Sequence, residues 1–130
     1  MNPAVAQFIA CINQRDVEGL CRLMTPDHLF VDSLGVEVRG QEPMSAGWRA
    51  YFAMVPDCHI TVTEHLEYGP TVALFGRAGG TYSPDGQVLP QNRWEAPAAW
   101  LAVVRDGLLA EWHVFADNEP MRRLMSAAPM

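Results

Sequence analysis

Lysine is absent from this chain, and positive charge is scarce altogether. All nine basic residues are arginine, fifteen residues are acidic, and the formal net charge is −6. Because no basic run or stripe is present to neutralise phosphates, nucleic acid is not an expected partner. No apolar run approaches the roughly 18–20 residues that span a bilayer, and the first residues show no signal peptide. We therefore expect a cytoplasmic protein that binds neither nucleic acid nor membrane.

Cysteine and histidine are also few, and their spacing matches no metal site. The three cysteines, Cys11, Cys21 and Cys58, are an odd number, which favours reduced thiols in the cytoplasm over disulfides. The four histidines show neither HxH nor HExxH spacing: His28, His59, His65 and His113. The sequence also contains no glycine-rich phosphate loop after a strand and no GxSxG motif. We expect no metal and no cofactor.

Hydrophobic residues make up 49% of the chain and charged residues 18%, which is typical of a globular protein. The length of 130 residues suits one domain over residues 1–130. Neither a repeat nor a linker divides it.

The first 55 residues carry the helical patterns. Apolar residues at helical spacing predict a first helix over residues 5–12, and Asp16 can cap a second, which ends at Thr25-Pro26-Asp27. Residues 28–32 (HLFVD) predict a short strand, and residues 36–38 are expected to pair near it across a turn at Gly35. A third helix follows Gly40 and closes at Pro56.

The rest of the chain is rich in strands. Four runs alternate or are apolar throughout: residues 58–66, 71–82, 94–104 and 108–116. The Asp106-Gly107 pair predicts a hairpin between the last two strands, and the glycines of the second run predict bends. A last short helix begins at Pro120. Helices grouped first and strands grouped last predict an α+β fold, in which N-terminal helices pack on a strongly curved antiparallel sheet that encloses a pocket.

This order resembles the nuclear-transport-factor-2-like superfamily, whose cone-shaped fold is shared by ketosteroid isomerases, SnoaL-like polyketide cyclases and limonene epoxide hydrolases. Three stretches carry the resemblance: FIACINQRDVEGLCRLMTPDHLFVDSLGVEVRG (residues 8–40), EAPAAWLAVV (residues 95–104) and DGLLAEWHVFADNEP (residues 106–120). It implies a single SnoaL-like domain with a ligand-binding pocket. Because the fold hosts many unrelated functions, it does not imply one reaction.

The resemblance places Asp32 where ketosteroid isomerases keep the carboxylate that moves a proton between carbons. It places Phe8 and Ala99 where these isomerases keep the two donors of the oxyanion hole. Since loss of one such donor costs about 10²–10³ in rate, steroid isomerisation is not expected. By the same alignment, Val114 stands where the epoxide hydrolases keep an acid on the last strand, which argues against that reaction too.

Asp32 is the leading candidate for a catalytic residue. Along the strand, His28, Phe30 and Asp32 share one face, so all three are expected to line the pocket. A carboxylate in an apolar cavity can act as a general acid or base. The alternative is that Asp32 caps the turn at residues 33–35.

Three aromatic residues form a stripe on the third helix: Trp48, Tyr51 and Phe52. Such a stripe is commonly core, but in this fold the third helix forms part of the cavity wall, so these rings are candidates for contact with a substrate. On the last strand, the resemblance directs Trp112 and Val114 to the pocket. His113 and Asp117 would lie on the outer sheet face, where relatives dimerise; the alternative is that they form an acid/base pair inside.

Two functions remain open from the sequence. One is a cofactor-free isomerase, cyclase or hydratase that uses Asp32 on an apolar, carbonyl-type substrate. The other is a non-catalytic ligand-binding or dimeric assembly domain of the same fold. In either case the expected partners are a small apolar molecule and a second copy of the chain, bound through the sheet face.

Overall fold

A computed structural model describes residues 1–127 of the chain. Its helices are α1 (Pro3–Gln14), α2 (Val17–Arg22), α3 (Gln41–Met54) and α4 (Glu119–Ala127), with a 3₁₀ turn at Pro90–Asn92. Its strands are β1 (Met24–Val31), β2 (Glu37–Arg39), β3 (His59–Tyr68), β4 (Thr71–Thr81), β5 (Arg93–Arg105) and β6 (Leu108–Ala116). The predicted α+β class and the order of its elements are confirmed.

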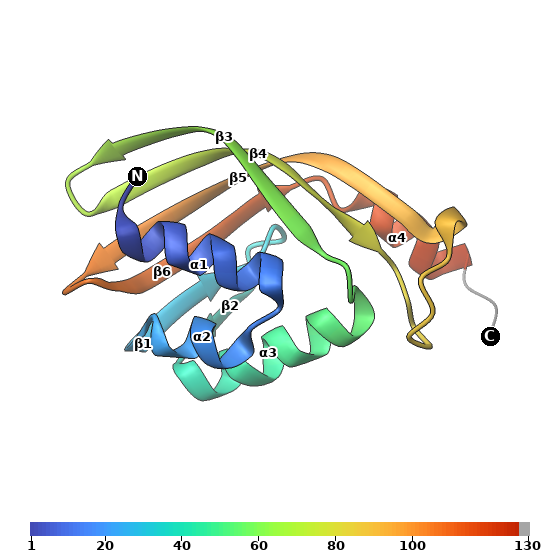
Figure 1. The fold of residues 1–130 in the computed structure, drawn as a ribbon, viewed down its shortest axis with the longest axis horizontal. Coiled ribbons are helices and arrows are strands. Elements are labelled where there is room, and N and C mark those ends of the chain that lie inside the picture. Colours follow the sequence, from blue (N-terminus) through green and yellow to red (C-terminus); the bar gives the residue numbers. More distant parts are fainter. Residues whose placement is uncertain (128–130) are drawn as a thin grey trace.

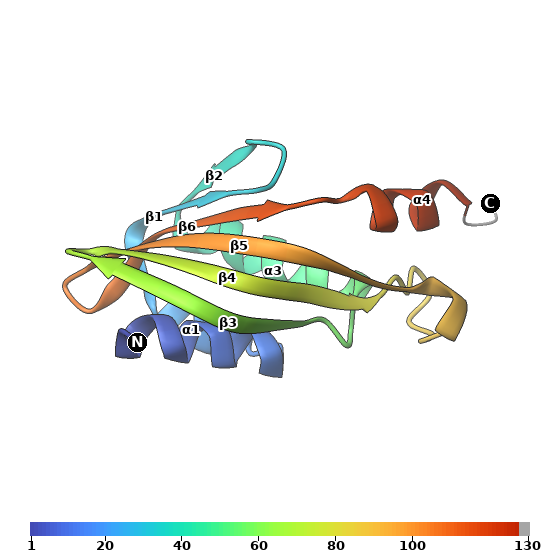
Figure 2. The same ribbon diagram turned by 90° about the horizontal axis from the view of Figure 1, so that it is seen from above.

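All six strands of the described chain form one sheet in the order β2-β1-β6-β5-β4-β3 (Figure 2). Neighbours are antiparallel except β1 and β6, which run parallel. Strand β1 begins earlier than predicted, because Met24 pairs with Leu109 of β6 and the Leu109 amide donates to the Leu23 carbonyl (2.6 Å). The segment expected to end the second helix is therefore the first part of a strand.

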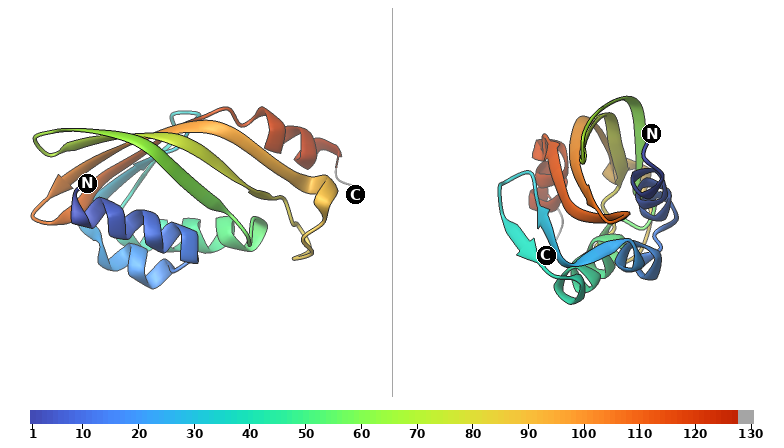
Figure 3. Two further views of the ribbon diagram at one scale, coloured as in Figure 1. Left: turned by 45° about the horizontal axis from the view of Figure 1, so that its top comes forward. Right: turned by 90° about the vertical axis from the view of Figure 1, so that its left-hand side faces the viewer.

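The sheet curls, and α1, α2 and α3 lie against its concave side (Figures 1 and 3). Asp16 caps α2 as predicted, since its Oδ1 accepts a hydrogen bond from the Gly19 amide at 2.9 Å. The apolar faces of α1 and α2 meet the inner residues of the sheet, so that Phe8, Leu20 and Trp112 are fully buried together. Among residues 1–127, no helix combines the length and apolar character needed to cross a membrane.

The curvature has a local cause in β3 and β4. Their register shifts between Val62 and Glu64, opposite Gly76 and Phe75. A Cβ atom on Gly76 would lie 1.7 Å from the Thr61 carbonyl oxygen, so only glycine permits this close approach of the two backbones. The predicted hairpin is also present: Asp106 and Gly107 both adopt positive φ (54° and 76°), as a tight two-residue turn requires. The close approach at Gly76 therefore contributes to the concave shape of the sheet.

Candidate functional site

A cavity of about 740 Å³ opens between the concave face of the sheet, α3 and α4. Its volume is within the range of small-molecule sites, about 300–1,000 Å³. Most of its lining is apolar or aromatic, and all four tryptophans of the chain contribute: Trp48, Trp94, Trp100 and Trp112. The polar side chains of the lining come mainly from two segments near the mouth, the turn after β1 and the start of α4.

Helix α3 supplies one aromatic wall. Trp48 is 8% exposed, meets the Phe30 ring edge-to-face at 5.9 Å between centroids and stacks on Phe52 at 5.3 Å. Tyr51 and Trp48 line the cavity, as does Phe30 from β1. Phe52, a predicted substrate contact, is not among the lining residues, because it packs behind Trp48 on the side away from the cavity.

Asp32 lies at the rim of the cavity, immediately after β1, and its carboxylate makes turn contacts. Oδ1 accepts hydrogen bonds from the amides of Leu34 and Val36, both at 2.9 Å. Among residues 1–127, Oδ2 has no hydrogen-bond donor. One oxygen of Asp32 therefore caps the turn, as the alternative interpretation predicted, and a role of the other oxygen towards a ligand stays a prediction.

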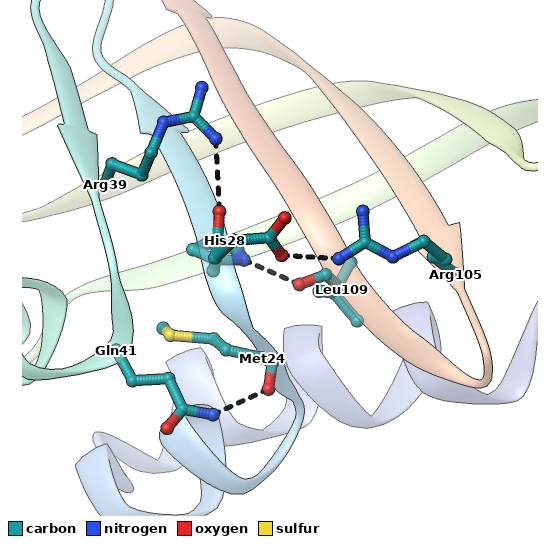
Figure 4. Close-up of polar contacts among 7 residues, drawn as sticks. Met24, His28, Arg39, Gln41, Arg105 and Leu109 are labelled. Carbon is teal, nitrogen blue, oxygen red and sulfur yellow. Dashed lines mark hydrogen bonds and ion pairs between the residues drawn. The ribbon is translucent and has the colours of Figure 1, made fainter.

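His28, a predicted substrate contact, does not line the cavity. It faces the interior like Phe30, but it lies under the Phe8 ring (6.2 Å between centroids) and is fully buried. Figure 4 shows its Nδ1 against the Leu109 carbonyl, at 2.7 Å. A carbonyl only accepts, so Nδ1 carries the proton and Nε2 is unprotonated, and burial lowers the pKa of the ring. His28 is a core residue.

The last strand directs its residues inward and outward in alternation, as predicted. Trp112 and Val114 line the cavity. His113 lies on the outer face, where Nε2 is 2.8 Å from a Glu111 oxygen. Asp117 lies beyond the end of β6, lines the cavity mouth and accepts a hydrogen bond from the Glu119 amide at 2.9 Å. Because the strand ends before Asp117, the structure does not bring His113 and Asp117 together as an acid/base pair.

Phe8 and Ala99, the two positions that the resemblance assigns to oxyanion donors, lie on different sides of the sheet. Phe8 is fully buried against Trp112, with 4.8 Å between ring centroids, so an apolar ring fills that place. Ala99 pairs with the half-exposed Phe115 and lies on the outer face of the sheet, whereas its neighbour Trp100 lines the cavity. A donor at position 99 would therefore point away from the cavity, whereas a donor at position 100 would point into it.

The lining includes further residues, and the sequence signals for them differ. Trp100 lies six residues after Trp94 on β5 and so shares its face, a pattern that strand periodicity could have revealed. His59 lies at the start of β3, beside the cavity. Arg122 lies at the mouth, on the cavity side of α4. That Arg122 lines the cavity follows only from where α4 packs, which no local pattern in the sequence indicates.

Two ionisable groups of the wall keep their protons at neutral pH. Burial raises the pKa of the Cys58 thiol to about 12, so it is not a nucleophilic thiolate. Burial likewise raises the pKa of Tyr51 above its usual range. Within residues 1–127, no three His, Cys, Asp or Glu side chains gather as metal ligands would.

Comparisons with known proteins agree with this architecture. The family model described as SnoaL-like domain matches residues 5–112. A protein of ketosteroid isomerase-like fold from Catenulispora acidiphila DSM 44928, solved with trimethylamine, is 20% identical over 98% of this chain and 96% of its own, with a TM-score of 0.83. No curated protein matches the sequence.

Two further solved structures are candidate polyketide cyclases. The SnoaL-like one from Jannaschia sp. CCS1 is 21% identical over 97% of this chain and 91% of its own, with a TM-score of 0.82. IdmH from Streptomyces antibioticus is 25% identical over 95% of this chain and 96% of its own, with a TM-score of 0.76. These likenesses confirm the predicted cone-shaped fold.

Proposed function

Because this chain belongs to the SnoaL-like domain family, we propose that its cavity binds an apolar, carbonyl-bearing small molecule and that the protein acts on it as a cofactor-free, cyclase-like enzyme. The observation that carries the proposal is a mostly apolar cavity of about 740 Å³ with the Asp32 carboxylate at its rim. Such a cavity buries a ring system, while its few polar groups fix the orientation of the ligand.

In this proposal Asp32 is the proton-transfer group. Its Oδ1 is engaged by two backbone amides, which hold the carboxylate in one orientation. Its Oδ2 is the oxygen that would accept a proton from a carbon next to the substrate carbonyl. The electron pair of the broken C–H bond then moves towards the carbonyl, and the same proton can return to another atom of the substrate. Two candidate polyketide cyclases of the same fold support this class of chemistry.

A second candidate function is non-catalytic binding of the same class of ligand. The observations that favour it are the two amide hydrogen bonds at Asp32, which suit a turn residue, and the apolar Phe8 in place of an oxyanion donor. The two candidates share the cavity and its ligand. They differ only in whether a proton moves.

Exchange of carbon-bound protons separates the two. The probe is α-tetralone, a two-ring ketone whose C–H bonds next to the carbonyl exchange in D₂O and can be followed by proton NMR. We expect the wild type to accelerate the exchange and Asp32→Asn to bind the ketone equally while losing about 100-fold or more of the rate. Asparagine keeps an oxygen for both turn amides, so the fold of the turn is preserved.

The matched control is Asp117→Asn, which removes the other carboxylate of the rim. We expect it to leave the exchange rate close to that of the wild type. A wild type that binds the ketone without accelerating exchange is a binder. Equal exchange in wild type and Asp32→Asn would refute the role of Asp32.

We also propose that two copies associate through the outer face of the sheet. That face exposes large apolar side chains, among them Phe75 (41% exposed) and Phe115 (57% exposed). Exposed apolar patches commonly mark interaction sites between proteins. Phe115→Glu would place a charge on this face and is expected to release a 14.4 kDa monomer in sedimentation. A wild type that already sediments as a monomer would contradict the proposal.

A further inference from the structure

Tyr51 places a hydroxyl group in the aromatic wall that α3 contributes to the cavity. Its ring is held by edge-to-face contacts with Trp48 (6.3 Å) and Phe52 (6.2 Å), its neighbours on α3, and the residue lines the cavity. Among residues 1–127, its hydroxyl takes part in no hydrogen bond, yet it is not among the polar atoms sealed completely away. The hydroxyl therefore has no partner but remains accessible.

The state of this hydroxyl is fixed by its surroundings. Burial raises the pKa of Tyr51 above its usual range, and the neighbouring Cys58 acts in the same direction. The phenol therefore keeps its proton throughout the neutral range. It is therefore an accessible O–H donor, and an oxygen of a bound ligand can accept its hydrogen bond.

Two other lining residues, Trp48 on α3 and Trp94 on β5, also carry unsatisfied donors. Their indole Nε1 atoms are buried, and neither has a hydrogen-bond partner among residues 1–127. A buried donor without a partner costs about 1–3 kcal/mol, and natural cores contain few of them. Of these three donors, the Tyr51 hydroxyl is the accessible one, which makes it the donor that a ligand can reach without rearrangement of the wall.

We propose that Tyr51 donates a hydrogen bond to the carbonyl oxygen of the bound ligand, and that this residue selects ketones over hydrocarbons of the same shape. This inference rests on the proposed binding of a carbonyl-bearing molecule. Phe8 on α1 stands at the position of an oxyanion donor but carries no polar group, so Tyr51 on α3 would supply the donor in its place. The bond strengthens when the oxygen gains negative charge, so it would also assist proton removal next to the carbonyl.

A matched pair of ligands and a matched pair of variants test this role. The ligands are α-tetralone and tetralin, which differ by one carbonyl group, and binding is read from the fluorescence of the four tryptophans, all of which line the cavity. Tyr51→Phe removes only the hydroxyl. The control, Tyr68→Phe, makes the same change at a side chain that is 89% exposed on β3 and outside the cavity.

We expect Tyr51→Phe to weaken binding of α-tetralone about three- to tenfold, the value of one hydrogen bond, and to leave tetralin binding unchanged or tighter. Tyr68→Phe should change neither. Unchanged ketone binding in Tyr51→Phe, or an equal loss for ketone and hydrocarbon, would overturn the inference while leaving the proposed function standing. A wild type that binds neither ligand would instead contradict the proposed function, and the inference with it.

Discussion

Asp57, in the segment after α3, joins this segment to the end of β4, and its removal should destabilise the fold. Its Oδ1 accepts the Thr81 amide and its Oδ2 accepts the Thr81 hydroxyl, both at 2.7 Å. Thr81 is 2% exposed, so water cannot replace either bond without rearrangement. Asp57→Ala therefore leaves two buried donors of Thr81 without their acceptor.

The magnitude follows from these two donors. Each buried donor that loses its partner costs about 1–3 kcal/mol, or about 2–6 kcal/mol for the two. Because Asp57 itself is only partly buried, we expect the lower part of this range, a loss of about 2–4 kcal/mol in the free energy of unfolding. For a chain of this length, that lowers the melting temperature by about 6–15 °C. Asp57→Asn should cost less, because the amide oxygen still accepts the Thr81 N–H.

Urea unfolding at pH 7, followed by tryptophan fluorescence, measures the loss. Thr81→Val removes the hydroxyl side of the pair, and the double variant with Asp57→Ala isolates the coupling between the two side chains. A loss below about 0.5 kcal/mol in Asp57→Ala, which is typical of an ordinary surface change, would refute the reasoning. So would an absence of coupling in the double-mutant cycle.

The same pair predicts a pH dependence. Burial acts to raise the pKa of Asp57, but the hydrogen bonds from Thr81 outweigh it, and the pKa in the folded state lies below the usual range. The unfolded chain therefore takes up this proton first as the pH falls. The contribution of Asp57 is present above about pH 4 and is lost as the pH falls through the folded-state pKa. Asp57→Asn should lack this acid-sensitive part.

Three other predictions concern single positions. Gly76→Ala should destabilise the protein by about 3 kcal/mol, because its Cβ would meet the Thr61 carbonyl oxygen at 1.7 Å. The control Gly47→Ala lies inside α3 with 3.9 Å to its nearest neighbour and should stabilise the protein by about 0.5–1 kcal/mol. Urea unfolding that shows the reverse order would contradict the close approach of β3 and β4 at Gly76. Burial lowers the pKa of His28, so its contribution to stability is present above about pH 6.5 and is lost as the pH falls through the lower, folded-state pKa; a His28→Gln variant that keeps this dependence would contradict it. Cys58, with a pKa of about 12, should resist iodoacetamide at pH 8 in the folded protein and react in urea, as mass spectrometry would show; rapid labelling of the folded form would contradict its burial.

Local patterns in the sequence were sufficient for much of the fold. The cap at Asp16, the turn at Asp106-Gly107 and the bend at Gly76 each depend on residues that are adjacent in the chain or on one short pairing. The inward direction of Trp112 and Val114 follows from the alternation of a strand, once one face is known to be buried. Such features are predictable because their energetics are decided within a few residues.

The membership of the site was decided by tertiary packing. His28 shares a face with Phe30, but Phe8 covers it, so periodicity alone could not distinguish a core residue from a lining one. Phe52 is likewise one residue from Tyr51 yet packs behind Trp48. Depth beneath a surface depends on which distant element covers a side chain, and no local pattern encodes that.

Asp32 shows both levels in one residue. An acid after β1 at a turn is predictable from local residues, because the turn amides that bind its Oδ1 lie within four residues. The position of this turn at the rim of a cavity depends on packing, because the cavity is walled by residues as distant as Tyr51 and Trp94. The physical reason is that a turn needs only its own backbone donors, whereas a cavity exists only where a curved sheet and the helices that cover it leave a space between them.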